Sequence, residues 1–301
     1  MTDNRKIDPT TGTETTGHSW DGIEELNTPL PRWWLWTFYA TIVWGVIYTI
    51  LYPAWPMVSG ATAGLLGYST RAEVAAEIKR VDLSNANLID SLVTVDLAVL
   101  RDNEDLHRFA VQAGRSVFAA NCSQCHGAGA GGVVASGYPN LLDDDWLWGG
   151  TMDDIAYTVR HGIRNEEDPD ARFSEMPPFD WMEDAELDAT AHFVRSLSDL
   201  DHNATAAAKG AALYADNCSA CHGEKGLGDR EIGAPNLADA IWLRGDSQEA
   251  ILRQLKAPRM GVMPPWQARL GEAEVRAVTA YVYGLGGGEA AVGDAEAAPA
   301  E

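Results

Sequence analysis

Cysteine and basic residues are scarce in this sequence. Only 4 of its 301 residues are cysteine, and all four lie in two short motifs at 122–126 and 218–222, which leaves none for a disulfide. Lysine and arginine total 22 against 44 aspartate and glutamate residues, so the formal net charge at pH 7 is −22. A chain this acidic is not expected to bind nucleic acid, whose phosphates are also negative. The acidic charge indicates either solubility or long-range attraction of a basic protein partner, which salt would weaken.

Long apolar runs are scarce too, and the first one, residues 33–58, contains no charged residue. It starts too late for a cleavable signal peptide and lacks a small-residue cleavage site. Its helical part, residues 33–52, is long enough to cross a hydrocarbon layer of about 30 Å. Aromatic residues stand near both ends, as at two membrane interfaces: Trp33, Trp34, Trp36, Tyr52 and Trp55. The run therefore predicts a transmembrane helix, whereas a buried core helix is usually shorter and keeps a polar stripe.

The charges around this run favour a cytoplasmic N-terminus. Arg5, Lys6 and Arg32 precede the run, and only Arg71 lies within the 20 residues after Tyr52. Positive residues are enriched on the cytoplasmic side of such helices. The span contains no acidic residue or histidine, so it offers no proton relay of its own.

The sequence Cys-x-x-Cys-His occurs twice, at 122–126 and 218–222. It is the attachment signature of a c-type haem, in which two thiols form thioether bonds and the adjacent imidazole ligates the iron. A zinc site or a thioredoxin-like redox pair would leave the following histidine unexplained in both copies. We therefore expect two covalently bound haem c groups, held by these residues: Cys122, Cys125 and His126 in the first motif and Cys218, Cys221 and His222 in the second.

The similarity between the two regions extends beyond the motifs at a constant offset of 96 residues. Gly114 corresponds to Gly210, Pro-Asn-Leu at 139–141 recurs at 235–237, and Trp146 corresponds to Trp242. Self-similarity at a fixed long period indicates duplicated units. Each unit has the size of a small domain that a covalent cofactor helps to stabilise.

Downstream of each motif, Met-Pro-Pro is followed by an aromatic residue, at 176–179 and 263–266. His/Met ligation is common in electron-transfer haems and raises their potential. We therefore expect Met176 to ligate the first haem and Met263 the second. Replacing either by alanine should leave its haem attached but lower its potential. Other candidates are Met152, Met182 and His161 for the first haem and Met260 for the second. The first unit carries nine extra residues, placed within 163–175 as a surface loop.

The sequence pattern predicts mostly helices, including closing helices near 184–197 and 272–285. Residues 88–100 fit both a helical and a strand period, and a capping box is expected at Thr70 and Glu73. The first 20 residues and the tail are expected to be disordered. The predicted parts are an N-terminal cytoplasmic segment (1–32), a transmembrane anchor (33–55), a connector (56–105), one haem domain (106–199), another (200–286, after a hinge at 198–205) and a tail (287–301).

Each repeat resembles a class I cytochrome c domain, with an N-terminal helix, Cys-x-x-Cys-His, a Pro-Asn-Leu loop, a methionine loop and a C-terminal helix. The resemblance implies an all-α fold, with one transmembrane helix followed by two tandem domains. It also implies that the first helix of each repeat crosses the last one at these residues: Gly114, Phe118 and Phe193 in the first repeat, and Gly210, Tyr214 and Tyr281 in the second.

The chain as a whole, over about residues 20–286, resembles the dihaem subunits of cbb3-type cytochrome c oxidases. The most specific stretch is residues 21–34, Asp-Gly-Ile-Glu-Glu-Leu-Asn-Thr-Pro-Leu-Pro-Arg-Trp-Trp, directly before the anchor. The resemblance implies an electron-transfer subunit in the bacterial inner membrane with periplasmic haem domains. It would accept electrons from a cytochrome c donor and pass them, through a monohaem cytochrome c subunit, to the catalytic haem–copper subunit. Oxygen would be reduced there, not in this chain.

Three other functions fit the sequence less well. A free-standing anchored carrier, or the cytochrome subunit of a dehydrogenase, could share both haem domains but has no reason to carry residues 21–34. A dihaem peroxidase or a gas sensor would need one iron with an open position, and two matched methionine loops argue against that.

Overall fold

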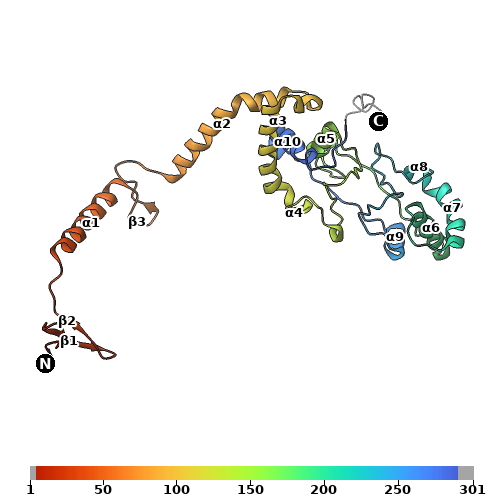
Figure 1. Cartoon of the computed structure of the whole chain (residues 1–301). Helices are drawn as coiled ribbons and strands as arrows, with labels where there is room; N and C mark the ends of the chain where they lie inside the picture. The colour runs from red at the N-terminus through yellow and green to blue at the C-terminus, as the bar shows by residue number, and fades with distance from the viewer. Residues whose placement is uncertain (1–4, 291–301) are drawn as a thin grey trace, which may run out of the picture. The chain divides into compact units, whose positions relative to one another are not determined.

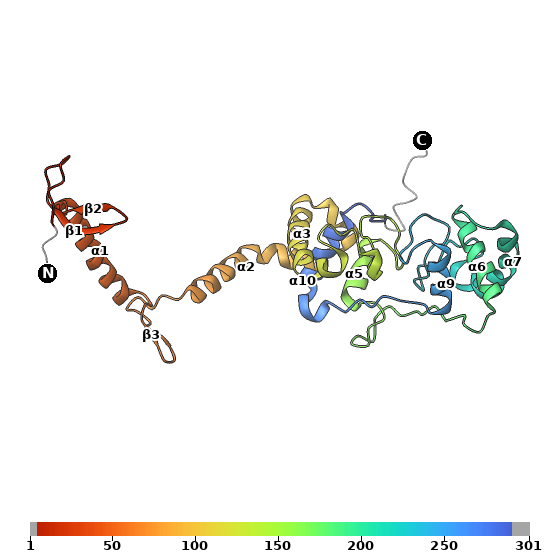
Figure 2. The ribbon, with the colours of Figure 1, turned by 90° about the horizontal axis from the view of Figure 1, so that it is seen from below.

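The computed structural model describes residues 5–290 of the chain. It falls into two compact units, Met1–Ser84 and Asn85–Glu301, each described by itself below. Helices predominate in both units (Figures 1 and 2), in agreement with the all-α expectation.

A β-hairpin opens the first unit, where disorder was expected for residues 1–20. Strands β1 (Thr15–Trp20) and β2 (Ile23–Leu26) pair antiparallel. Asp21 and Gly22 join them with positive φ angles of 51° and 84°, the conformation that Asp-Gly favours in two-residue hairpin turns. The expectation of disorder was therefore wrong for residues 15–20, because low apolar content does not prevent a turn-directed hairpin.

Helix α1 (Arg32–Leu51) follows, within one residue of the predicted span. It is the one helix among residues 5–290 that is long and apolar enough to cross a membrane, with a mean hydropathy of 1.5 over an 18-residue window. None of that window is buried in protein. A core helix would be covered by other elements, so the exposed apolar surface favours the membrane-span interpretation over the core-helix alternative.

After α1 the chain folds back on the helix end. The amides of Leu65 and Leu66 donate to the carbonyls of Ile50 and Leu51, and strands β3 (Pro56–Met57) and β4 (Gly60–Ala61) form a short hairpin between them. Helix α2 (Thr70–Thr94) begins next. Its cap is Ser69, whose Oγ accepts from the amide of Ala72, rather than the predicted Thr70.

The second unit contains short helical turns between longer helices. Its elements are a 3-10 helix η1 (Leu97–Asp102), α3 (Glu104–Val117), a π-helical turn η2 (Phe118–Cys122), α4 (Ser123–His126), a 3-10 turn η3 (Val134–Ser136), α5 (Met152–His161), α6 (Asp184–Leu197), α7 (Ala204–Asn217), α8 (Ser219–His222), α9 (Gln248–Lys256) and α10 (Gln267–Tyr283).

The ambiguous stretch 88–100 is helical and packs within the chain. Leu92, Leu97 and Leu100 are each at most 3% exposed and form one core cluster with residues of α3, α5 and α10. The Arg276 side chain of α10 donates through Nη1 to the carbonyls of Leu92 and Val95, at 2.9 and 2.5 Å. These bonds satisfy carbonyls at the end of α2 that have no partner within the helix.

The closing helices of the two repeats are exchanged. Helix α10 packs against α3, and α6 packs against α7, as both views show (Figures 1 and 2). A Cβ added to Gly114 would lie 2.0 Å from the carbonyl oxygen of Ala277, and one added to Gly210 would lie 2.0 Å from that of Ala189. The glycines therefore stand at helix crossings, as expected, but the expectation that each repeat closes on itself was wrong.

The aromatic pairs at these crossings follow the same exchange. The Phe118 ring lies 5.4 Å from that of Tyr281, and the Phe193 ring lies 5.0 Å from that of Tyr214. The exchange follows from the short connection between α6 and α7, which consists of residues 198–203. A helix–helix connection of this length makes its two helices antiparallel neighbours. The predicted hinge at 198–205 is therefore a turn inside one helix pair.

The described part of the predicted tail is ordered by contacts with loop residues. The carbonyl of Gly287 accepts from Trp146 Nε1 at 2.5 Å. The carboxylate of Glu289 accepts from the Gly150 amide at 2.8 Å and lies 2.5 Å from Arg230 Nη2. Disorder was therefore the wrong expectation for residues 287–290, and residues 291–301 lie outside the described range.

Candidate functional site

The two Cys-x-x-Cys-His motifs adopt the same local structure. The last four residues of each motif form a short helix, α4 or α8, that is followed by a glycine with positive φ, Gly127 at 80° and Gly223 at 76°. The carbonyl of each motif histidine accepts an amide six residues on, from Gly132 to His126 and from Gly228 to His222, both at 2.9 Å. The duplicated sequence thus produces duplicated geometry.

Both motif histidines are oriented through Nδ1. His126 Nδ1 lies 3.3 Å from the carbonyl oxygen of Pro139, and His222 Nδ1 lies 3.1 Å from that of Pro235. Burial lowers the pKa of both imidazoles, against the smaller opposing effect of those carbonyls. A neutral imidazole with Nδ1 held by a carbonyl leaves Nε2 as the metal-binding atom. The Pro-Asn-Leu repeat therefore supplies the group that aims each histidine.

Partial burial of the first cysteine in each motif favours the neutral thiol. Burial, and to a smaller extent the neighbouring motif cysteine, raise the pKa of the Cys122 and Cys218 thiols to about 11. Zinc binding and thiol–disulfide exchange both require the thiolate, which lowered pKa values favour. These environments fit sulfurs that end in covalent thioether bonds.

The methionine loops are exchanged together with the closing helices. Met263 packs on the core cluster that contains Phe118 and Val159 and is also contacted by Cys122. Met176 packs on the cluster that contains Tyr214 and is also contacted by Cys218. The packing therefore favours a different pairing from the expected one of Met176 with the first motif and Met263 with the second, because each methionine lies at the motif of the other repeat.

Equivalent backbone hydrogen bonds hold the two loops in these exchanged positions. The amide of Trp266 donates to the carbonyl of Val159 at 3.1 Å, and that of Phe179 donates to Leu255 at 2.8 Å. Val159 and Leu255 are 96 residues apart and lie in the last turns of α5 and α9. Met263 also exchanges two backbone hydrogen bonds with residue 163, at 2.9 and 3.0 Å. The sequence motifs alone did not indicate these partners, although the 96-residue offset makes Val159 and Leu255 equivalent positions.

The alternative ligands named from the sequence lie in other surroundings. Met152 belongs to the cluster under η1, which contains neither motif. Met260 Sδ accepts from the amide of Met176 at 3.3 Å, so it supports the Met176 loop. Met182 is buried in the same cluster as Met176. The structure thus separates Met152 from both motifs, while Met182 shares the second site.

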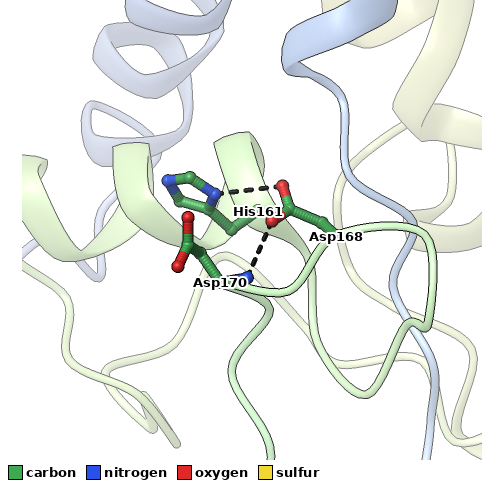
Figure 3. A group of neighbouring side chains, drawn as sticks. All are labelled: His161, Asp168 and Asp170. Carbon is green, nitrogen blue, oxygen red and sulfur yellow. Dashed lines mark hydrogen bonds and ion pairs between the residues drawn. The ribbon is translucent and has the colours of Figure 1, made fainter.

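His161, the fourth alternative, is bound to the inserted loop. Its Nδ1 lies 3.0 Å from Asp168 Oδ2, and Asp168 Oδ1 accepts the amide of Asp170 at 2.8 Å (Figure 3). The Asp170 amide has the largest effect on the pKa of Asp168 and lowers it; burial acts in the opposite direction, and His161 lowers the pKa further. Ligand atoms of His161, Asp168 and Asp170 lie within 4.8 Å of one another. Their hydrogen bonds explain this grouping as the attachment of residues 163–175 to the end of α5.

The residues around both motifs fit a haem c. Each site combines two cysteines, a histidine with Nδ1 already engaged, a methionine loop and a wall of aliphatic and aromatic side chains. The buried Nε1 of Trp242, in the second site, has no hydrogen-bond partner among residues 5–290. A buried indole N–H usually finds an acceptor, so the site has a donor that a cofactor carboxylate can satisfy.

Comparison with known proteins agrees with this geometry. Residues 12–59 match the N-terminal domain of cytochrome oxidase-cbb3, FixP; residues 111–198 match cytochrome c; and residues 205–282 match cytochrome c oxidase, cbb3-type, subunit III. The first match contains the hairpin and α1, and the other two follow the duplicated sequence.

Relatives of similar length extend the match over nearly the whole chain. The cbb3-type cytochrome c oxidase subunit CcoP of Cereibacter sphaeroides is 54% identical over 278 residues, covering 91% of this chain and 95% of the relative. The subunit FixP of Sinorhizobium medicae is 48% identical over 291 residues, 96% of this chain and 100% of the relative. The subunit CcoP of Rhodobacter capsulatus is 48% identical, covering 93% and 99%. The chain therefore belongs to the CcoP/FixP family and is an electron-transfer subunit of a cbb3-type cytochrome c oxidase.

Proposed function

We propose that the chain carries electrons through two covalently bound c-type haems. The first would be held by Cys122, Cys125, His126 and Met263. The second would be held by Cys218, Cys221, His222 and Met176. The observation that carries this proposal is the repeated site, in which a histidine oriented by a proline carbonyl shares a core with a methionine from the other repeat.

The haem supplies one-electron chemistry, and the protein supplies attachment, orientation and exclusion of water. The Pro139 and Pro235 carbonyls orient the histidines, and the valine and leucine side chains of the two clusters keep solvent away. A histidine and a methionine at each site would together leave no open iron position for peroxide or a gas. This ligand set favours electron transfer over the peroxidase and sensor alternatives.

The exchange ties the two haem sites to each other. Each site draws its histidine from one repeat and its methionine loop and closing helix from the other. We infer that residues 106–199 and 200–286 are sequence repeats rather than independently folding domains. The two haems would then keep a fixed separation, which suits electron transfer between them.

The partners and location are part of the same proposal. Helix α1 would cross the inner membrane once, with the haem sites on the periplasmic side and residues 1–32 on the cytoplasmic side. Arg5, Lys6 and Arg32 before the span support this orientation. Electrons would arrive from a cytochrome c and leave toward a monohaem cytochrome c subunit and the catalytic haem–copper subunit, where oxygen is reduced. This chain would not reduce oxygen itself.

Purification through a tag on this chain in mild detergent tests the proposal. We expect two haem c per chain, haem b bands in the reduced-minus-oxidised spectrum and cyanide-sensitive oxygen uptake from an artificial donor. Haem c alone, from cross-linked membranes in which subunits cannot dissociate, would instead support a free-standing carrier. A value of one haem c per chain would contradict the two-site assignment.

A further inference from the structure

The uncharged stretch that contains helix α1 continues well beyond the end of the helix. Residues 33–70 contain no aspartate, glutamate, lysine, arginine or histidine. Helix α1 ends at Leu51 and α2 begins at Thr70, so residues 52–69 belong to neither helix and still carry no charge. Connections that face water are normally polar. An uncharged connection in a chain with 44 acidic residues therefore indicates surroundings other than water.

The connection forms the β3–β4 hairpin, which is bonded to the last turn of α1 (Figures 1 and 2). The amides of Leu65 and Leu66 donate to the carbonyls of Ile50 and Leu51, at 2.9 and 3.1 Å. Gly64 permits this close approach, because it has a φ of 71° and a Cβ added to it would lie 2.4 Å from the Leu51 carbonyl oxygen. The hairpin is therefore fixed at the level where α1 ends.

Several backbone polar groups of the hairpin are paired inside it. Thr62 Oγ1 accepts from the amides of Ala54 and Trp55, at 3.3 and 3.1 Å, and the Thr62 amide donates to the Trp55 carbonyl at 3.0 Å. Pro53 and Pro56 have no N–H group that needs a partner. Unpaired backbone groups exclude irregular segments from apolar lipid, because such groups are costly there. Internal pairing removes part of that cost.

The hairpin exposes large apolar side chains. Five of them are each at least 59% exposed: Trp55, Met57, Val58, Leu65 and Leu66. Val58 lies in the turn between β3 and β4 and has the largest exposure of the five. Exposed apolar side chains that lie this close together, with no charge among them, mark a surface that another apolar phase covers.

We propose that the β3–β4 hairpin lies in the outer leaflet of the membrane interface, with Trp55, Met57 and Val58 inserted among the lipids. The proposal rests on α1 crossing the membrane, as proposed above. Because the hairpin is bonded to the last turn of α1, it lies where that helix leaves the hydrocarbon. Each interfacial layer is about 5–8 Å deep. A strand rises about 3.3 Å per residue, so the two-residue strands β3 and β4 and their turn fit this layer.

The composition of the segment favours lipid over another protein subunit. Tryptophan and tyrosine are enriched at membrane interfaces. The rings of Tyr48 and Tyr52 lie 4.8 Å apart, and those of Tyr52 and Tyr68 lie 5.4 Å apart. Protein interfaces combine an apolar core with a polar rim, whereas residues 52–69 provide no charged group. The Tyr68 hydroxyl also donates to Glu73 at 2.9 Å, which ties the start of α2 to the same layer.

Collisions of a nitroxide spin label with oxygen and with a water-soluble nickel complex test this depth, because oxygen concentrates in lipid and the nickel complex in water. The label is attached to Val58→Cys in the intact oxidase, reconstituted in phosphatidylcholine vesicles, with the unmodified complex as background. Gly45→Cys within α1 is the lipid control. Ala76→Cys, on the face of α2 opposite the apolar Val74, is the water control. The oxygen-to-nickel collision ratio for Val58→Cys should exceed that for Ala76→Cys several-fold and approach that for Gly45→Cys.

A charge beside the turn of the hairpin provides a second test. In the Val58→Cys background, Met57→Asp should lower the collision ratio several-fold, whereas Ala76→Asp should leave it unchanged. A ratio at position 58 equal to that of the water control would place the hairpin in water. Low collision rates with both reagents would show that another subunit covers it. Either result overturns the proposal, whereas a ratio for Gly45→Cys as low as that of the water control would refute the membrane span of α1 itself.

Discussion

At the scale of single residues, the helix crossings depend on two glycines. Gly114 and Gly210 allow α3 and α7 to approach the backbones of α10 and α6 more closely than any side chain permits. Both occur at equivalent positions of the repeat, and sequence analysis identified them as crossing points. The sequence could not identify what they cross, because the facing residues, Ala277 and Ala189, belong to similar helices.

Gly210→Ala should therefore destabilise the second haem site. The new methyl group would lie 2.0 Å from the Ala189 carbonyl oxygen, so the helices must separate. We expect a loss of roughly 1–3 kcal/mol, seen as a lower thermal midpoint. Gly129→Ala is the matched control, because a Cβ at Gly129 meets no atom within 4 Å. An equal thermal midpoint for the two variants would show that this crossing does not exist.

At the scale of elements, three helices meet through the carboxylate of Glu272. It pairs with Arg160 of α5 at 2.8 Å and with Arg276 of α10 at 2.8 Å, and Arg276 in turn binds the end of α2. Burial acts to raise the pKa of Glu272, but the hydrogen bonds from Arg160 and Arg276 outweigh it and hold the pKa below its usual value. The ionised carboxylate is therefore favoured in the folded protein.

This pairing gives a pH-dependent prediction. A carboxyl whose pKa is lowered by folding adds stability above its unfolded pKa, near 4.5, and loses it as the pH falls through the lower folded value. Glu272→Gln should lower the thermal midpoint at pH 7, and the difference from the unmodified protein should shrink as the pH falls below 4.5. The control is Glu274→Gln, an exposed position on the same helix. A difference that stays constant with pH would contradict the ion-pair account.

Sequence periodicity located the elements well but not their partners. The closing helix was expected near 184–197, and α6 spans Asp184–Leu197 because Leu187, Ala191 and Val194 give it one buried face. The exchange was missed because both closing segments have the same pattern, a Met-Pro-Pro-aromatic loop followed by an apolar helix face. The local sequence pattern therefore does not show which methionine loop and closing helix pack against which Cys-x-x-Cys-His motif. The information lies in the short connection 198–203, which keeps α6 beside α7.

At the scale of the whole molecule, the acidic charge is uneven along the chain. Residues 106–200 contain 16 acidic and 6 basic residues, a net charge of −10, whereas residues 201–286 contain 10 and 9, a net charge of −1. Each site contains residues of both repeats. The difference in charge between the repeats therefore does not show at which site a partner docks. A net negative charge of this size would still attract a positively charged protein partner from a distance.

The rate at which the purified complex oxidises a basic cytochrome c should therefore fall several-fold as salt is added. Raising the ionic strength from about 0.01 M to 0.15 M shortens the Debye length from about 30 Å to 8 Å and screens the attraction. An uncharged small reductant serves as the control and should be oxidised at a nearly constant rate. If the cytochrome c rate does not change with salt, electrostatic steering has no part in donor capture.

The pairing of each methionine with the opposite motif is the central claim, and one measurement tests it most directly. In a Cys218→Ser/Cys221→Ser background only the first haem remains, so its sixth ligand can be followed by the methionine–iron(III) charge-transfer band and by the midpoint potential. The account predicts that Met263→Ala abolishes the band and lowers the potential, whereas Met176→Ala leaves both unchanged. Loss of the band in Met176→Ala, with Met263→Ala unaffected, would contradict the exchange and restore the consecutive pairing expected from the sequence.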